Sequence, residues 1–238
     1  MTLVKNANAG ALIMTSATVP DLVTSATLVG TTITSAQSPF VGEGNSYLLN
    51  GTSNYMYVPA GTNWVMGTGD FTIEWFQYMT SQPSNPRVFS IGTYPSATWA
   101  VSIEGGTFYH WEANGFRFSN VLSTPYLNTW IHFAISRISN QTRVFRNGTQ
   151  IGSTYGDSNN INNSITRLVI GQEALGNAAN SYFPGYLTNI RIVKGLGVYT
   201  GNFTKPTSAL TAIASANPYG GANTAAIPDG FTKLLLVP

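Results

Sequence analysis

Polar and apolar residues alternate along most of this chain, which is the pattern of half-buried β-strands. Residues 128–152 show the alternation most clearly. Ile131, Phe133 and Ile135 share one parity there and are expected to face a core, because successive side chains of a strand point to opposite faces. The Asn147–Gly148 pair, whose residues tolerate positive φ, predicts a tight hairpin turn.

Further strands are expected at short, regular intervals. They are predicted at residues 46–49, 54–58, 71–78, 87–92, 99–103, 107–112, 116–119, 165–171, 185–193 and 231–237. Gly, Asn and Pro separate these strands, and no segment has the periodicity of an amphipathic helix of three turns. The pattern therefore predicts an all-β fold, either a sandwich or a barrel.

Composition narrows the possible functions. Charged residues make up only 8% of the 238 residues, with a net charge of +2 and no basic cluster, so nucleic acid is not an expected partner. The absence of Cys excludes disulfides and zinc–thiolate sites. No apolar run is long enough to span a membrane, and Thr and Ser interrupt the apolar residues of the first 20, so neither membrane insertion nor a signal peptide is expected.

Three segments together resemble the laminin-G/pentraxin-like branch of the concanavalin A-like lectin/glucanase superfamily. They are GTGDFTIEWFQY (67–78), LNTWIHFAISRISNQTRVFRNGTQIG (127–152) and ITRLVIGQEALGNAANSYFPGYLTNIRIVKG (165–195). The run FPGYLTNIRIVKGLGVYTGNFTKPTSALT (183–211) is similar to the ending of such domains in structural proteins of tailed phages and large DNA viruses. The resemblance implies a jelly-roll β-sandwich of two antiparallel sheets that binds or scaffolds rather than catalyses.

This resemblance also suggests a division of the chain. We expect a laminin-G-like jelly-roll domain over residues 1–211, with a leading strand near residues 10–15, and a C-terminal extension over residues 212–238. The apolar run at 231–237 is expected to close a sheet edge or to pair with a partner.

Carboxylates and histidines were considered as catalytic groups. The carboxylates are Asp21, Glu43, Asp70, Glu74, Glu104, Glu112, Asp157, Glu173 and Asp229. A glycosidase needs two of them roughly 5–10 Å apart across a cleft, and the E-x-D-x-x-E run usual in enzymes of the superfamily is absent. Glu104 and Glu112 flank one predicted hairpin and are expected to face solvent, and Glu74 is expected at the surface or a sheet edge.

The two histidines, His110 and His132, have no metal-ligand spacing, so a structural role is expected for His132 and no catalytic residue is assigned. No P-loop lysine or dinucleotide fingerprint is present, and no cofactor is expected.

Calcium is the metal to consider, because many laminin-G and pentraxin relatives bind it at a rim. In those relatives an Asp follows the strand that corresponds to residues 88–92, but here the loop reads TYPSAT. The partner loop, QEALGNAANSY, offers Glu173 and amides. Calcium prefers six to eight oxygens with carboxylates among them. No metal site is therefore predicted, although binding through amides and carbonyls stays open.

The same two loops suggest a glycan site, because sugar sites combine an aromatic platform with amide and hydroxyl groups. The candidate residues are Tyr94, Trp99, Asn177, Asn180 and Tyr182. The alternative is that Trp99 is buried and Tyr94 caps a turn.

The sequence favours a non-enzymatic structural protein of a virion, in a capsid, tail or fibre, with a lectin-like sandwich for assembly and host attachment. Its expected partners are other virion proteins or copies of itself, as a homo-oligomer, and cell-surface glycans. The alternatives are an extracellular lectin module and, third, a polysaccharide hydrolase or lyase.

Overall fold

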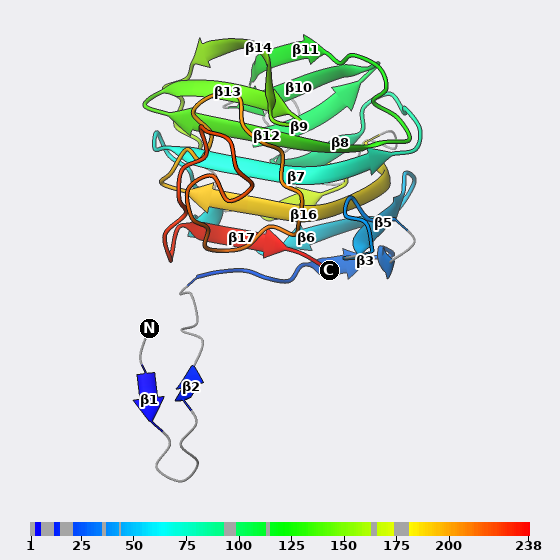
Figure 1. Cartoon of the computed structure of the whole chain (residues 1–238). Helices are drawn as coiled ribbons and strands as arrows, with labels where there is room; N and C mark the ends of the chain where they lie inside the picture. Colours follow the sequence, from blue (N-terminus) through cyan, green and yellow to red (C-terminus); the bar gives the residue numbers. More distant parts are fainter. Residues whose placement is uncertain are drawn as a thin grey trace.

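The fold is a β-sandwich (Figure 1), as the alternation predicts. The computed structural model describes residues 3–5, 12–14, 21–34, 37–42, 44–92, 99–112, 115–162, 166–173 and 181–238. Within these residues the only helical element is the short 3-10 turn η1 (Thr62–Trp64). The expected class, an all-β sandwich of two antiparallel sheets, is confirmed.

One sheet has seven strands, and neighbours in its order pair antiparallel. In spatial order they are β11 (Gly115–Val121), β10 (Thr107–Glu112), β9 (Trp99–Glu104), β8 (Arg87–Ile91), β15 (Leu168–Ile170), β6 (Tyr55–Val58) and β3 (Thr27–Val29). The three consecutive strands β9, β10 and β11 form an antiparallel meander.

The second sheet has eight strands. In spatial order they are β14 (Thr149–Gly156), β13 (Gln141–Arg146), β12 (Trp130–Ile138), β7 (Phe71–Met79), β16 (Pro184–Lys194), β5 (Ser46–Asn50) and β4 (Thr32–Thr34), with β17 (Thr232–Leu236) paired to β16. A separate pair consists of β1 (Leu3–Lys5) and β2 (Leu12–Met14). A strand therefore occurs where a leading strand was expected, but its partner is β1.

The main core lies between the two sheets and is rich in aromatic rings. Trp75 is fully buried, and its ring stacks on Phe108 and Phe133 at centroid distances of 6.4 and 5.6 Å. Ile131, Phe133 and Ile135 are all buried in this core, which confirms the predicted inward face of β12.

A second core covers the outer face of the eight-stranded sheet. The C-terminal segment after β16, orange and red in Figure 1, runs over β12, β7 and β16. The second core consists of buried residues from both the sheet and this segment: Ala134, Phe145, Val193, Val198, Tyr199, Phe203 and Ile227. Burial of both faces of β12 was not predicted, because the C-terminal segment lacks the period of a strand or a helix.

Strand β17 confirms the strand predicted at residues 231–237 and shows how it is used. Asn189, with φ of 52°, lies at a register shift in β16, so the first half of β16 pairs with β5 and the second half with β17. On the other side of β17, the Val23 N–H donates to the Lys233 carbonyl at 3.0 Å and Val23 O accepts from Leu235 N at 2.9 Å. Both edges of β17 are thus occupied within the chain around Lys233–Leu235.

The expectation for Glu74 was wrong. Its carboxylate is fully buried beneath the C-terminal segment, where Oε1 accepts from Arg191 Nη2 at 2.6 Å and Oε2 faces His132 Nε2 at 3.0 Å. Burial by itself would raise the pKa of Glu74, but the Arg191 charge and the hydrogen bonds from His132 and Tyr199 outweigh it and lower the pKa to about 2. The network explains why a carboxylate is stable at an interior position, and it gives His132 the structural role that was expected.

Candidate functional site

The predicted glycan site is only partly described by the structure. Tyr94, Asn177 and Asn180 lie outside the described residues. Trp99 has no exposed surface, its indole N–H donates to His110 Nε2 at 2.9 Å, and its ring packs edge-on against Phe71. A ring without exposed surface cannot serve as a sugar platform, so Trp99 is corrected to a core residue.

Tyr182 is partly exposed. It lies next in sequence to Ser181, which contacts β8 of the seven-stranded sheet. The carbonyl of its neighbour Ser181 accepts a hydrogen bond from the backbone N–H of Arg87 at 2.9 Å. Arg87 begins β8 and lies opposite Ser102 of β9, which in turn lies opposite Tyr109 of β10. The face next to this row of residues carries a cluster of exposed rings.

We define the Trp111 cluster as Tyr109, Trp111 and Phe116, on the outer face of β10 and β11. Phe108, His110 and Glu112 point inward from β10, so alternation turns Tyr109 and Trp111 outward. The Trp111 ring lies 6.1 Å from Tyr109, nearly parallel, and 5.8 Å from Phe116, edge to face. Phe116 is 56% exposed.

An ion pair flanks this cluster. Arg87 Nη1 donates to Glu104 Oε1 at 2.6 Å, and the Arg87 guanidinium lies 5.9 Å from the centre of the Trp111 ring. Arg87 is 7% exposed, whereas the Glu104 side chain is 23% exposed, so the pair is held in place yet reachable. Together with Asn85 and Trp111 these residues line a cavity of about 250 Å³.

A hydrogen-bond chain fixes the orientation of the indole. Trp111 Nε1 donates to Ser102 Oγ at 3.4 Å, and Ser102 Oγ donates to Glu104 Oε1 at 2.6 Å. The ring and the carboxylate are therefore oriented by the same serine before any ligand arrives, which reduces the entropy lost on binding.

The site is short because the middle of the seven-stranded sheet is covered. Ser90 Oγ on β8 donates to the Gln172 carbonyl at 3.0 Å, and Val169, Gln172 and Glu173 are buried. A polymer lying across all the strands of this face would have to displace these residues. The Trp111 cluster lies at the end formed by β9, β10 and β11, and a separate pair of partly exposed rings, Tyr55 and Tyr57, lies on β6 beside Arg167.

A second aromatic cluster provides an internal comparison. Tyr78, Trp130 and Tyr186 are partly exposed neighbours on the eight-stranded sheet, with ring centroids 5.7 Å apart for Tyr78–Trp130 and 5.8 Å for Tyr78–Tyr186. None of the ion pairs and cation–π contacts of the described residues reaches this Trp130 cluster. The Trp111 cluster differs by having hydrogen-bonding groups beside its rings.

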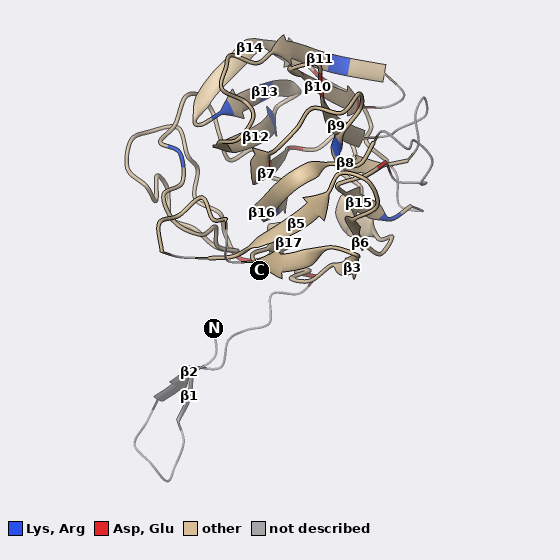
Figure 2. Ribbon diagram, turned by 90° about the vertical axis from the view of Figure 1, so that its right-hand side faces the viewer, with Lys and Arg blue, Asp and Glu red and all other residues tan. Residues whose placement is uncertain are grey.

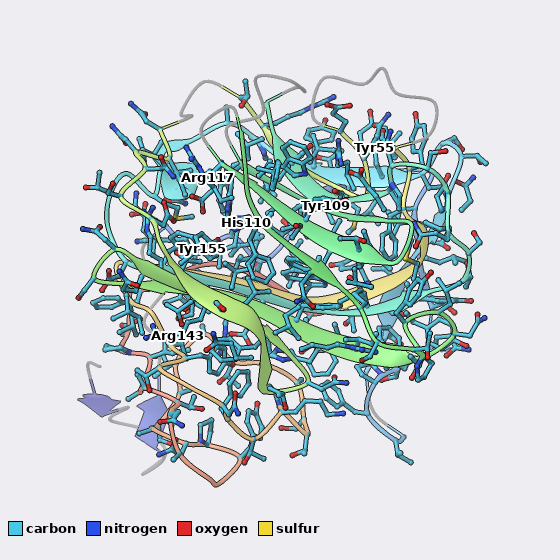
Figure 3. All side chains as sticks on the ribbon, turned by 90° about the horizontal axis from the view of Figure 1, so that it is seen from above. Tyr55, Tyr109, His110, Arg117, Arg143 and Tyr155 are labelled. Atoms are coloured by element: carbon cyan, nitrogen blue, oxygen red, sulfur yellow. The ribbon has the colours of Figure 1, made fainter. Side chains whose placement is uncertain are left out.

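Charged groups are scarce on the whole molecule (Figure 2), and several of them are buried. Glu112 was expected to face solvent, but it has no exposed surface. Its Oε1 lies 3.2 Å from Nε2 of His110, and His110 lies beside Tyr155, as Figure 3 shows from above. This correction removes Glu112 from any carboxylate pair on the outer face.

Hydrogen bonds indicate the tautomer of His110, and burial determines the charge of both His110 and Glu112. His110 Nε2 accepts from Trp99, so Nδ1 carries the proton and faces Tyr155 Oη at 2.7 Å. Burial lowers the pKa of His110 to about 3, so the ring is neutral, and its contact with Glu112 at 3.2 Å is not an ion pair. Burial, with the nearby Asp157 carboxylate, raises the pKa of Glu112 to about 9. Glu112 is therefore protonated at neutral pH, and the nearby Asp157 is contacted by Arg137 and Thr142.

In the described part of the chain, no group of three or more His, Asp or Glu side chains is placed to hold a metal ion. No helix among those residues has the length and apolar character needed to cross a membrane.

Comparisons with solved structures agree with this architecture. The enzymatically active domain of tailspike protein 2 from bacteriophage CBA120 matches with a TM-score of 0.61 and 14% identity, over 99% of this chain and 35% of that one. The binding domain of botulinum neurotoxin serotype G gives 0.53 and 15%, over 82% and 47%. Domain 4 of AbnA, an extracellular arabinanase from Geobacillus stearothermophilus, in complex with arabinotriose, gives 0.50 and 17%, over 70% and 77%.

These identities are low, so the structural likeness shows the fold alone, and the chain spans about a third of the tailspike structure. A sequence search of curated proteins finds no match. The sequence profile of a laminin-G type family, described as concanavalin A-like lectin/glucanases superfamily, matches residues 50–196. This match spans more than half of the sequence, and the chain therefore belongs to the concanavalin A-like lectin/glucanases superfamily.

Proposed function

We propose that this chain is a non-enzymatic, carbohydrate-binding component of a phage or viral particle, and that the Trp111 cluster is its glycan site. The observation that carries the proposal is the oriented Trp111 ring beside the Arg87–Glu104 pair in a cavity of about 250 Å³. An aromatic platform with a few convergent polar groups is the usual composition of a small-ligand site. The site differs from the loop position predicted from sequence, where Tyr94, Asn177 and Asn180 lie outside the described residues.

Two properties favour binding over hydrolysis. Glu104 is the one carboxylate among the described residues that line the cavity, and it is engaged by Arg87 and Ser102. Hydrolysis of a glycoside ordinarily needs a second carboxyl group on the other side of the bond. The tailspike and neurotoxin neighbours, described as an enzymatically active domain and a binding domain, show that the fold alone does not decide between these activities.

Two observations support a role in a phage or viral particle: the structural similarity to a phage tailspike and the small number of charged residues. The first structural neighbour is a phage tailspike, and so few charged residues suit a subunit whose surface is covered by neighbouring proteins or by other copies of the chain. Detection of the chain by mass spectrometry in purified particles tests this part. Its consistent absence from particles that carry its gene would overturn the role and leave the lectin function to be tested separately.

Glycan binding is tested with a glycan array, followed by calorimetry on the sugars that bind. We expect Trp111→Ala to weaken binding at least about fivefold, since truncation of an aromatic residue at the centre of a binding site costs about 1 kcal/mol or more. Trp130→Ala is the matched control because it removes an indole of similar exposure from the other sheet. Equal losses in both variants, or no binding by the unmodified chain to any glycan, would refute the site.

Catalysis is tested by incubating the chain with polysaccharides and measuring the release of reducing ends. We expect no release above that of a heat-inactivated sample. Release that Glu104→Gln abolishes would replace the binding proposal with a hydrolase.

A further inference from the structure

We infer that the cavity at Trp111 recognises a neutral sugar through two adjacent hydroxyl groups and discriminates against acidic sugars. The inference rests on the proposed glycan-binding function and names the class of ligand for that site. It is argued from the hydrogen-bonding capacity that Arg87 and Glu104 retain after their contacts within the chain.

Glu104 lines the cavity and has one hydrogen-bonding position that its contacts within the chain leave unused. Its Oε1 accepts from Arg87 Nη1 and from Ser102 Oγ, both at 2.6 Å, which fills the two lone-pair positions of that oxygen. Its Oε2 accepts from the Asn85 amide at 3.1 Å when the amide nitrogen faces the carboxylate. One acceptor position on Oε2 is left, and the side chain is 23% exposed.

Arg87 offers the complementary donor. A guanidinium has five N–H donors in a fixed fork, and the Glu104 contact uses one of them. The group lies over the Trp111 ring at 5.9 Å. A donor and an acceptor therefore lie side by side next to one aromatic ring.

Adjacent hydroxyls of a pyranose match this arrangement. One hydroxyl donates to Glu104 Oε2, and its neighbour accepts from an Arg87 N–H. The apolar C–H face of the pyranose ring then lies on the Trp111 indole, which Ser102 already orients. Each group of the sugar meets a protein group of opposite hydrogen-bonding character.

The charge of the cavity explains the discrimination. Among the described lining residues, Arg87 is the one cation and Glu104 the one anion, and they neutralise each other at 2.6 Å. A sugar carboxylate placed here would approach Glu104 without an unpaired cation to compensate it. Like charges brought together in a partly desolvated site are repulsive, and repulsion of this kind is a common source of specificity.

The test compares matched sugars by ligand-observed NMR and calorimetry. The probes are methyl glycosides of glucose, galactose and mannose, their oligomers, and the corresponding uronic acids. We expect each uronic acid to bind at least about tenfold more weakly than its neutral parent. Equal or tighter binding of the uronic acids through Trp111 would overturn the inference while leaving the proposed function intact. Failure of every sugar to bind would overturn both.

Deoxy analogues locate the recognised hydroxyls. In a panel lacking one hydroxyl at a time, we expect a loss of about tenfold or more at two adjacent ring positions, because a site built to hydrogen-bond a hydroxyl rejects the analogue that lacks it. Losses at non-adjacent positions, or at none, would contradict the paired recognition. This experiment uses the unmodified chain and does not depend on the folding of a variant.

Two variants test the protein side. Glu104→Gln should weaken neutral sugars and reduce their advantage over uronic acids, since the repelling charge is gone. Ser102→Ala keeps the charge but releases the indole, so it should weaken both classes of sugar by a similar factor. An unchanged preference in Glu104→Gln, with the fold verified by circular dichroism, would overturn the assigned role of Glu104.

Discussion

The phenolic oxygen of Tyr199 donates to Glu74 Oε2 at 2.7 Å, so a residue of the C-terminal segment completes a network whose carboxylate belongs to the centre of the sheet. Arg191 and His132 supply the other contacts. The C-terminal segment therefore does more than cover apolar surface. It provides a donor without which a buried carboxylate would lack full hydrogen bonding.

Replacement of Tyr199 by Phe should lower the free energy of unfolding by about 1–3 kcal/mol, because Glu74 loses a donor while the aromatic ring is kept. Denaturation in urea measures the change. Tyr219→Phe is the control, since that hydroxyl donates to Ser208 O at 3.5 Å in an exposed position. It should change the free energy by no more than about 0.5 kcal/mol. Similar losses in the two variants would contradict the role of the network.

Glu74 also predicts the behaviour of the protein in acid. Its pKa is lowered from 4.5 to about 2 in the folded state. The stability it contributes is therefore fully present above the unfolded pKa, and it is lost as the pH falls through the folded value. The thermal transition should fall steeply between pH 4.5 and 2. Added salt should change this fall little, because the carboxylate is buried. A flat profile over this range would contradict the assignment.

The effect of Glu112 on the pH dependence of stability has the opposite sign to that of Glu74. The pKa of Glu112 is raised from 4.5 to about 9, so unfolding releases a proton between these values and stability declines as the pH rises through them. Glu112→Gln cannot titrate and keeps a donor for Asp157. We expect the variant to match the unmodified chain near pH 4 and to be more stable near pH 8, by about 1–3 kcal/mol. Parallel stability curves for the two proteins would show that Glu112 is ionised in the folded state.

The two tryptophans of the seven-stranded sheet should separate stability from binding. Trp99→Ala empties a fully buried position and should cost about 3–5 kcal/mol. Trp111→Ala should cost about 1 kcal/mol or less and remove glycan binding. Chemical denaturation and the glycan array measure the two effects. A large stability loss in Trp111→Ala would show that its ring serves packing rather than recognition.

Strand alternation was sufficient to predict the architecture but not the site. The inward face of β12 follows from the parity of Ile131, Phe133 and Ile135. In the segment TFYHWE both parities contain aromatic residues, so the pattern alone could not show that Trp111 points outward and Phe108 inward. The signal that was missed is that His110 and Glu112 share the parity of Phe108, which indicates a buried polar network.

The remaining errors have one physical cause. Binary patterning places charged residues at the surface, and Glu74 and Glu112 violate it. Arg191 and Tyr199, which are distant in sequence, solvate Glu74, whereas burial near Asp157 keeps Glu112 in its neutral form. Such pairings depend on how the chain returns to the sheet, which a local pattern does not contain.

The parallel bridge between Val23 and Leu234 has a consequence for folding kinetics. It joins segments about two hundred residues apart, and β17 reaches its place in the sheet only after nearly all of this sequence has left the ribosome. Until then the second half of β16 lacks a partner, and Leu234 and Leu236 cannot fill their places in the core. Contacts of such long range predict slow closure of this part of the sheet. The incomplete intermediate is the species that a chaperone or a neighbouring subunit would meet first.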